Sequence, residues 1–213
     1  IFCMKKIYLF FLKILNLKVL AIFRTLISYN KNAANKLLIN DDLNVYDEHK
    51  KYFSKLLPPD RTLTIMDFGC GTGRYLDIFK NFKLVYLVDI SRHNLNLAAI
   101  KANSMNINFK LKRRSFSFLN TKADYFFSTG VFGQFYQFDS KVLKKIYSII
   151  NNNGKAVFTV KINDDITNEV LAVREHKIIE LLNGYKYKIH KKYFSGINET
   201  KDYFYVIELF KEH

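Results

Sequence analysis

Apolar and polar residues follow two periodicities in turn along the chain, which predict strands and helices. Short apolar runs bounded by turn residues indicate buried strands, whereas apolar positions three and four residues apart indicate helices that cover them. Strands that alternate with helices favour a mostly parallel sheet with right-handed crossover connections. The predicted strands are residues 62–67, 84–89, 107–113, 123–128, 155–161, 186–194 and 203–211, and the predicted helices are residues 45–57, 74–80, 91–103, 140–150 and 169–182.

The last two predicted strands have no helix between them, only a loop that contains Gly196. Two strands joined by a short loop pair antiparallel, whereas parallel neighbours need a crossover of a dozen or more residues. We therefore predict an α/β fold whose mostly parallel sheet has seven strands and ends in an antiparallel hairpin.

The most informative segment is residues 67–73, where the first predicted strand ends in an acid and glycine follows at alternate positions. Only glycine lets a strand turn sharply into a helix while its backbone lies against a ligand. A second apolar run, residues 84–88, is followed by Asp89. A glycine turn with an acid at the next strand end, about 20 residues later, is typical of a βαβ unit that binds a nucleoside. The Gly-x-Gly-x-Gly spacing differs from that of dinucleotide dehydrogenases.

Residues 67–73, Asp-Phe-Gly-Cys-Gly-Thr-Gly, resemble the first motif of class I S-adenosylmethionine-dependent methyltransferases. The resemblance continues through Val-Asp-Ile-Ser at residues 88–91 and through the order of elements from residue 45 onward. It implies a three-layer αβα Rossmann-like fold, a methyltransferase activity and S-adenosyl-L-methionine as cofactor. A nucleotide-binding domain of another class, such as a dehydrogenase, and a chance glycine turn are the alternatives.

S-adenosylmethionine presents an adenine, a ribose and a methionine tail with a cationic sulfonium. The N–H groups of residues 69–73 and the helix N-terminus that follows suit the carboxylate of the tail. Asp67 would supply negative potential near the ammonium and sulfonium groups, and Asp89 would accept hydrogen bonds from both ribose hydroxyls. The predicted cofactor-binding residues are Asp67, Phe68, Gly69, Cys70, Gly71, Gly73, Asp89, Ile90, Ser115, Phe116 and Thr129, with no metal site and no named catalytic residue.

The adenine contact is where this chain departs from the family. The resemblance implies that residues after the third strand, here 114–116, frame adenine. The family commonly has an acid there for the adenine amino group, but residues 112–119 contain none. Ser115 or a backbone carbonyl would have to replace it, or affinity is weakened.

The methyl acceptor should lie over the C-terminal ends of the fourth and fifth strands, beside residues 129–136 and 161–165. Residues 128–131, Ser-Thr-Gly-Val, lack the Asn/Asp-Pro-Pro-aromatic motif of enzymes that methylate base amino groups. The run 124–132 is instead similar to that of small-molecule and sugar methyltransferases. We therefore expect a small-molecule, saccharide or lipid-linked acceptor. Of the histidines, His49 could face the site or the solvent, and His93 is expected on a helix surface.

Composition changes this picture only slightly. Two cysteines, Cys3 and Cys70, are too few for a disulfide framework and fit a reducing cytoplasm. The net charge of +15 would suit nucleic acid, but lysine is enriched together with Asn, Ile, Phe and Tyr, as in AT-rich genomes. An RNA methyltransferase that uses the basic clusters at residues 110–114 and 186–192 as a phosphate track is one alternative. A non-catalytic protein that keeps the fold is another.

The N-terminal segment differs from the rest, with seven basic residues and no acidic one before Asp41. On a helix, four of these cations fall within about 20° of one another, and most of the remaining surface is apolar. The apolar run 7–12 is far shorter than the ~20 residues of a membrane-spanning helix, so residues 4–31 suit either a lid or peripheral membrane contact. We divide the chain into this basic apolar segment, residues 1–40, and a methyltransferase domain, residues 41–213, with Met4 as a candidate start.

Overall fold

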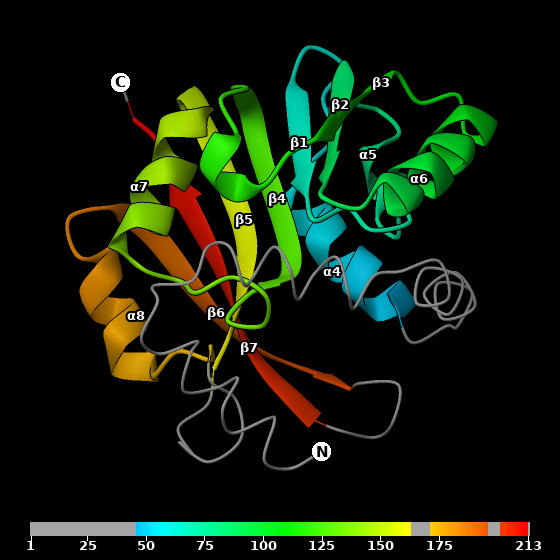
Figure 1. The fold of residues 1–213 in the computed structure, drawn as a ribbon. Helices are drawn as coiled ribbons and strands as arrows, with labels where there is room; N and C mark the ends of the chain where they lie inside the picture. Colours follow the sequence, from blue (N-terminus) through cyan, green and yellow to red (C-terminus); the bar gives the residue numbers. More distant parts are fainter. Residues whose placement is uncertain (1–45, 163–170, 196–200, 213) are drawn as a thin grey trace.

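The computed structural model describes residues 46–162, 171–195 and 201–212, which form one seven-stranded sheet with helices on both faces (Figure 1). The strands are β1 (Thr64–Phe68), β2 (Leu84–Asp89), β3 (Phe109–Arg113), β4 (Ala123–Phe132), β5 (Ile150–Lys161), β6 (Lys186–Ser195) and β7 (Lys201–Phe210). The helices are α4 (Asp47–Leu56), α5 (Leu76–Phe79), α6 (Arg92–Ser104), α7 (Ser140–Ile149) and α8 (Glu175–Leu182), with a 3-10 helix η2 (Phe116–Phe118).

The strand order is β3-β2-β1-β4-β5-β7-β6. Strands β1 to β5 pair in parallel, whereas β7 runs antiparallel to both β5 and β6. This confirms the predicted α/β fold and its terminal antiparallel hairpin. The strand order reverses at β1, which has β2 on one side and β4 on the other. Open α/β sheets bind ligands at such a switch point, outside the carboxyl ends of the strands.

Helices α4, α5 and α6 cover one face of the sheet, and α7 and α8 cover the other (Figure 1). Successive residues of β1 point to opposite faces of the sheet, and both side chains are buried. Ile65 packs on the face covered by α4, α5 and α6, and Met66 packs on the face covered by α7 and α8. A central parallel strand is buried on both faces, which explains its continuous apolar sequence. The predicted three layers are therefore confirmed.

Residues 151–154, Asn-Asn-Asn-Gly, separate the helix predicted at residues 140–150 from the strand predicted at residues 155–161, but they lie inside β5, which begins at Ile150. Asn153 has a positive φ of 61°, and the pairing of β5 with β4 shifts register near its start. Gly154 approaches β4 so closely that a Cβ atom there would lie 2.4 Å from the carbonyl oxygen of Asp124. The Asn-Gly signal therefore marks a bulge within a strand.

Two predicted helices are shorter than expected. The helix predicted at residues 74–80 is α5, which begins only at Leu76 because Gly73 has a φ of 88°, outside the right-handed helical region. The helix predicted at residues 169–182 is α8, which begins at Glu175. Val173 pairs instead with Ile162 in an isolated bridge, and its N–H donates to the carbonyl oxygen of Lys161 at 3.1 Å.

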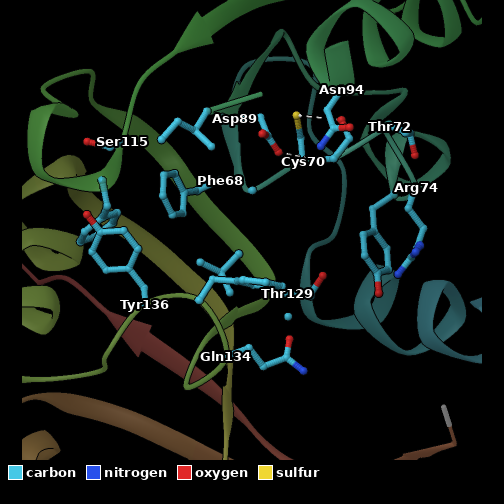
Figure 2. A pocket seen from close by; sticks show the side chains of 18 of the residues that line it. Phe68, Cys70, Thr72, Arg74, Asp89, Asn94, Ser115, Thr129, Gln134 and Tyr136 are labelled. Carbon is cyan, nitrogen blue, oxygen red and sulfur yellow. Dashed lines mark hydrogen bonds between the residues drawn. The ribbon is translucent and has the colours of Figure 1, made fainter. Parts of the chain in front are cut away.

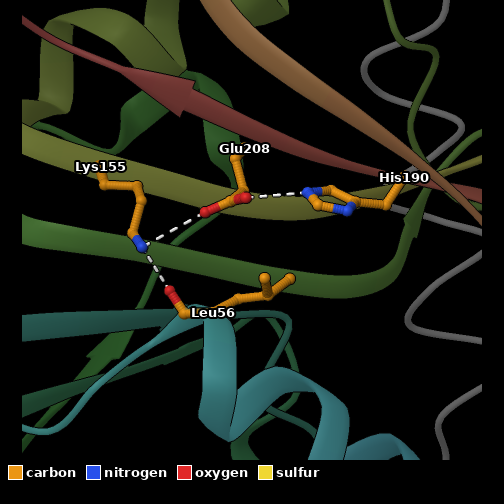
Figure 3. A network of polar contacts seen from close by, with 4 residues as sticks. All are labelled: Leu56, Lys155, His190 and Glu208. Atoms are coloured by element: carbon orange, nitrogen blue, oxygen red, sulfur yellow. Dashed lines mark hydrogen bonds and ion pairs between the residues drawn. The ribbon is translucent and has the colours of Figure 1, made fainter.

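A buried polar cluster joins the C-terminal hairpin to α4 (Figure 3). Glu208 of β7 is 6% exposed, with Oε1 2.8 Å from His190 Nε2 and Oε2 3.3 Å from Lys155 Nζ. Lys155 also donates to the carbonyl oxygen of Leu56, at the end of α4. A cation there satisfies one of the last helix carbonyls and interacts favourably with the helix dipole. The cluster therefore attaches the end of α4 to β5, β6 and β7.

The predicted N-terminal segment, residues 1–40, lies outside the described residues, and so do its basic stripe and the contact proposed for residues 4–31. The first described residue is Tyr46, directly before α4. No helix in the described part of the chain is long and apolar enough to cross a bilayer. The division of the chain at residue 40 stays a prediction.

Candidate functional site

A cavity of about 200 Å³ lies at the switch point, where the carboxyl ends of β1, β2 and β4 meet (Figure 2). Nine of the eleven predicted cofactor-binding residues line it, and the remaining two, Asp67 and Gly73, do not. The lining residues are Phe68, Gly69, Cys70, Gly71, Thr72, Arg74, Tyr75, Asp89, Ile90, Asn94, Arg114, Ser115, Phe116, Thr129, Gly130, Val131, Gln134, Phe135 and Tyr136.

The glycine turn is held against β2 by its own backbone. The N–H groups of Gly69 and Cys70 both donate to the carbonyl oxygen of Val88, at 2.8 and 3.1 Å. Gly71 has a φ of 54°, and a Cβ atom built on it would meet no atom within 4 Å. Because Gly71 lines the cavity, this open space is available to a ligand.

Gly73 has a packing role that sequence reasoning did not assign to it. A Cβ atom on this residue would lie 2.5 Å from Leu76 Cδ1 and 3.3 Å from the Cα atom of Ala98 in α6. Its φ of 88° is also one that other residues rarely adopt. Gly73 therefore allows the turn to approach α6 closely and lies behind the cavity.

These two glycines give a matched pair of variants. We expect Gly73→Ala to lower the free energy of unfolding, because it combines overpacking with backbone strain, by about 2 kcal/mol or more. Gly71→Ala should cost about 1 kcal/mol of strain and should mainly block the ligand. Chemical denaturation and cofactor titration of both variants check this. The assignment of the two roles fails if Gly71→Ala keeps wild-type affinity for the cofactor.

Asp89 is held at the edge of the cavity by two backbone groups. Its Oδ1 accepts a hydrogen bond from the N–H of Ser91 at 2.7 Å, and its Oδ2 accepts one from the N–H of Gly71 at 3.0 Å. Burial raises the pKa of this carboxyl, and the hydrogen bonds from Ser91, Gly71 and the Asn94 side chain oppose that rise. A carboxylate has about four acceptor sites, so a ligand that donates to Asp89 would share them with these protein groups.

Asp67 lies beneath the cavity. It is 2% exposed, and its Oδ2 has no hydrogen-bond partner among the described residues. Burial and the nearby charge of Asp89 raise its pKa to about 8. Asp67 is therefore mostly protonated at neutral pH until a cation comes close, and the negative potential expected from it depends on such a ligand.

This burial predicts an unusual pH dependence. The folded protein binds a proton at Asp67 up to about pH 8, whereas the unfolded chain releases it near pH 4, so unfolding free energy should fall as pH rises between these values. Asp67→Asn should remove that part of the slope and stabilise the ligand-free protein at pH 7 to 8, while weakening the binding of a cationic ligand. Urea denaturation at pH 5 to 8 measures this. Equal slopes for the two proteins contradict it.

The end of the cavity predicted to hold adenine is formed by η2 and the residues beside it. Phe116 is 2% exposed and contacts Phe68 edge-on, with ring centroids 5.0 Å apart. The hydroxyl of Ser115 is buried, with no hydrogen-bond partner in the described residues. Figure 2 shows Ser115 across the cavity from Thr129 and Gln134. Ser115 is thus a polar group available to a ligand at this end.

Residues 129–131 and 134–136, from the carboxyl end of β4 and the loop after it, also line the cavity as expected. Tyr75 is hydrogen-bonded to the side chain of Thr129, and burial raises the pKa of this phenol to about 12. Lys161 does not line the cavity, and residues 163–165 of the expected acceptor region lie outside the described residues.

Sequence reasoning missed four lining residues, namely Thr72, Arg74, Tyr75 and Asn94. Thr72 lies within the glycine turn, and Arg74 and Tyr75 follow it; the irregular backbone there hides which side chains point inward. Asn94 could have been identified from the sequence, because it comes three residues after the capping serine Ser91. In the structure its N–H donates to Ser91 Oγ, and it lies in the first turn of α6. Arg114 was expected near adenine but was not among the selected residues; it also lines the cavity.

The two histidines lie away from the lining. His49 is half-buried beside the Tyr46 ring, and burial, with Arg74 nearby, lowers its pKa to about 4. It is therefore neutral at physiological pH. His93 was expected on a helix surface, but it is half-buried, and its Nε2 atom is inaccessible to solvent. The reason is that the first turn of α6 packs against the site through Asn94 and Leu95.

Comparison with known proteins agrees with this geometry. A family model described as a methyltransferase domain matches residues 42–195. No curated protein matches the sequence. TehB from Haemophilus influenzae has a TM-score of 0.65 at 15% identity over 78% of this chain, which spans 62% of the TehB chain.

Two further structures are similar over longer shares of their own length. YcgJ from Bacillus subtilis has a TM-score of 0.65 at 10% identity, over 78% of this chain and 99% of that chain. Magnesium protoporphyrin IX methyltransferase from Synechocystis, solved with bound S-adenosylmethionine, has a TM-score of 0.60 at 17% identity, over 98% of this chain and 97% of that chain. The structural likeness supports the fold, and the family model supports the family. The chain therefore belongs to the methyltransferase-domain family and has the class I methyltransferase fold.

Proposed function

We propose that this methyltransferase uses S-adenosylmethionine and transfers its methyl group to a small-molecule, saccharide or lipid-linked acceptor by in-line displacement. The observation that carries the proposal is the meeting of nine of the eleven predicted cofactor-binding residues around one cavity at the switch point. Residues 41–213 would form the catalytic domain, in agreement with the family match to residues 42–195.

The polar groups of the cavity fit this cofactor. Asp67 Oδ2, Asn94 Oδ1 and Ser115 Oγ are buried without a hydrogen-bond partner in the part of the chain that the structure describes. Buried polar groups are normally paired, so three such atoms around one cavity indicate a polar ligand. Open space at the Cβ position of Gly71, next to the residue's hydrogen bond with Asp89, would admit it.

Each part of the cofactor has a chemically suitable partner in this chain. Asp89 would bind the ribose hydroxyls, and the buried Asp67 would stabilise the cationic sulfonium. Ser115 and Phe116 would hold adenine, with the Ser115 hydroxyl in place of the missing acid. When bound, S-adenosylmethionine supplies an already activated methyl group. The chain then has to align the acceptor and exclude water, and such alignment can lower a barrier by ~7–11 kcal/mol.

The acceptor end of the cavity suits a small molecule. Tyr75 is buried there beside Thr129, and Gln134 contributes an amide, whereas Tyr136 packs against Phe116 with ring centroids 5.8 Å apart. With a pKa of about 12, the Tyr75 phenol keeps its proton and would donate a hydrogen bond to the acceptor. A general base matters mainly for a hydroxyl acceptor, and no histidine is present in the described lining.

The RNA alternative loses part of its support. The two basic clusters lie on β3 and β6, the opposite edges of the sheet. Six strand spacings separate them, roughly 29 Å at about 4.8 Å each, so they do not form one continuous phosphate track. Lysines on edge strands also discourage the sheet from pairing with strands of other chains, and this role explains their presence without an RNA partner.

Ligand titration with unfolding as readout tests the proposed cofactor. S-adenosylmethionine and S-adenosylhomocysteine should each stabilise the protein by about 2.7 kcal/mol at 100 times their Kd. For a domain of this size, that shift raises the melting temperature by roughly 5–11 °C. NAD, which shares the adenosine but lacks the methionine tail, serves as the control. Stabilisation by NAD alone, or by none of the three, refutes the proposal.

A further inference from the structure

A second hollow adjoins the cofactor cavity where β2 and β3 end and η2 begins. It is lined by Ile90, Arg113, Arg114, Ser115 and Phe118, and it shares Ile90, Arg114 and Ser115 with the cavity. We call it the arginine groove. Ser115 is already assigned to the cofactor end, so the groove is characterised by its two arginines and its phenylalanine.

The two arginines are partly fixed in place. Arg113 Nε donates to the carbonyl oxygen of Ile90 at 3.1 Å, and Arg114 Nη1 donates to the carbonyl oxygen of Arg113 at 3.2 Å. Both side chains are exposed, so their other guanidinium N–H groups can reach a ligand. A guanidinium fork matches the geometry of phosphate oxygens better than an ammonium group does.

Phe118 supplies an aromatic face beside these cations. It is 72% exposed, the largest fraction among the exposed large apolar residues of the described chain. Phe116, two residues earlier in η2, is 2% exposed and packs in the core. The core therefore does not need the Phe118 ring, and η2 presents that ring in the groove.

The charge of the surrounding sequence favours an anionic partner. Residues 90–123 contain seven Lys or Arg residues and no Asp or Glu. They form α6, β3 and η2, so no carboxylate from these elements competes for the two arginines. A membrane surface fits less well, because the exposed aliphatic residues Ile100 and Leu111 do not line the groove with Phe118.

We propose that the arginine groove binds a phosphorylated nucleoside, with the phosphate on Arg113 and Arg114 and the base stacked on Phe118. Base stacking on an aromatic side chain beside backbone-tracking cations is the usual arrangement for single-stranded nucleic acid. The ligand is either a free mononucleotide or one nucleotide of a single strand. It lies beside the methyl-transfer cavity, so binding does not require that nucleic acid be the methyl acceptor.

Fluorescence anisotropy with a labelled ten-nucleotide single-stranded RNA tests this proposal, in competition with uridine 5′-monophosphate and with S-adenosylhomocysteine present throughout. Phe118→Ala should weaken RNA binding about tenfold, through lost stacking. The double variant Arg113→Gln/Arg114→Gln should also reduce the slope of log K against log salt by about 1.4. Matched controls are Ile179→Ala on α8 and Lys141→Gln/Lys144→Gln on α7, which should change neither quantity.

If uridine 5′-monophosphate displaces the RNA from the wild type but not from the groove variants, the ligand is a free nucleotide. If the RNA binds and the mononucleotide does not displace it, the ligand is a single strand. Equal losses in the control variants overturn the proposal, as does the absence of binding by both probes at low salt. It is also overturned if phosphatidylserine vesicles, and not RNA, bind in a way that depends on Phe118. Cofactor titration of the same proteins reports separately on the proposed methyltransferase site.

Discussion

Asp89→Ala should weaken the binding of S-adenosylmethionine by about 100-fold or more and should abolish the stabilisation of the protein by this ligand. The variant removes two charge-assisted hydrogen bonds to the ribose, each of which contributes about 1.5–3 kcal/mol. It also releases the N–H groups of Gly71 and Ser91, which the carboxylate holds in the ligand-free protein. Asp89→Asn keeps one acceptor oxygen and should lose less, about tenfold. Calorimetric titration of the three proteins measures this series.

Asp124→Ala is the matched control for this prediction. Asp124 is half-buried and, like Asp89, well hydrogen-bonded: it accepts from the N–H and hydroxyl of Thr64 and from the Asn151 amide. It lies at the start of β4, whereas the cavity is at the other end of the strand. Asp124→Ala should therefore lower stability without changing cofactor affinity. The ribose assignment is wrong if Asp89→Ala binds within threefold of the wild type.

The sequence predicted those parts of the fold whose signals are local. The strand predicted at residues 84–89 and the start of the helix predicted at residues 91–103 agree with the structure, since an uninterrupted apolar run and the capping Ser91 specify them without help from distant residues. The strand predicted at residues 155–161 begins five residues earlier, at Ile150, because Ile150 pairs with Ala123 of β4 and Gly154 packs against the carbonyl group of Asp124. A propensity for turns cannot anticipate such tertiary contact.

The same distinction holds for the candidate site. The glycine turn and Asp89 have the spacing that is typical of a nucleoside-binding βαβ unit, so the sequence alone predicts that they lie at one site. Tyr75 comes from irregular backbone, and only the folded chain shows that it reaches the cavity. Gly73 illustrates the opposite error, because a motif position can serve packing while its neighbour Gly71 faces the ligand. Motif matching therefore predicted the glycine turn and Asp89, but not the side chains from the irregular backbone beside them.

Glu208→Ala should lower the free energy of unfolding by about 3 kcal/mol, which corresponds to roughly 6–12 °C in melting temperature. The variant leaves Lys155 half-buried beside the Leu56 carbonyl without its carboxylate partner and removes the acceptor next to His190 (Figure 3). Glu180→Ala is the control, because its partner Lys177 lies 2.7 Å away on an exposed surface of α8. Solvent-exposed pairs contribute little, so this control should leave the melting temperature nearly unchanged.

A double variant separates loss of the cluster from loss of packing. Glu208→Leu combined with Lys155→Met removes both buried charges and keeps apolar volume, so it should recover most of the stability that Glu208→Ala loses. The cluster also bears on the site, because the α4 residue Phe53 packs edge-on against Tyr75, with ring centroids 5.7 Å apart. Loosening the end of α4 should therefore weaken ligand binding in Glu208→Ala and restore it in the double variant. If the double variant is as unstable as Glu208→Ala, apolar volume at this position matters more than charge pairing.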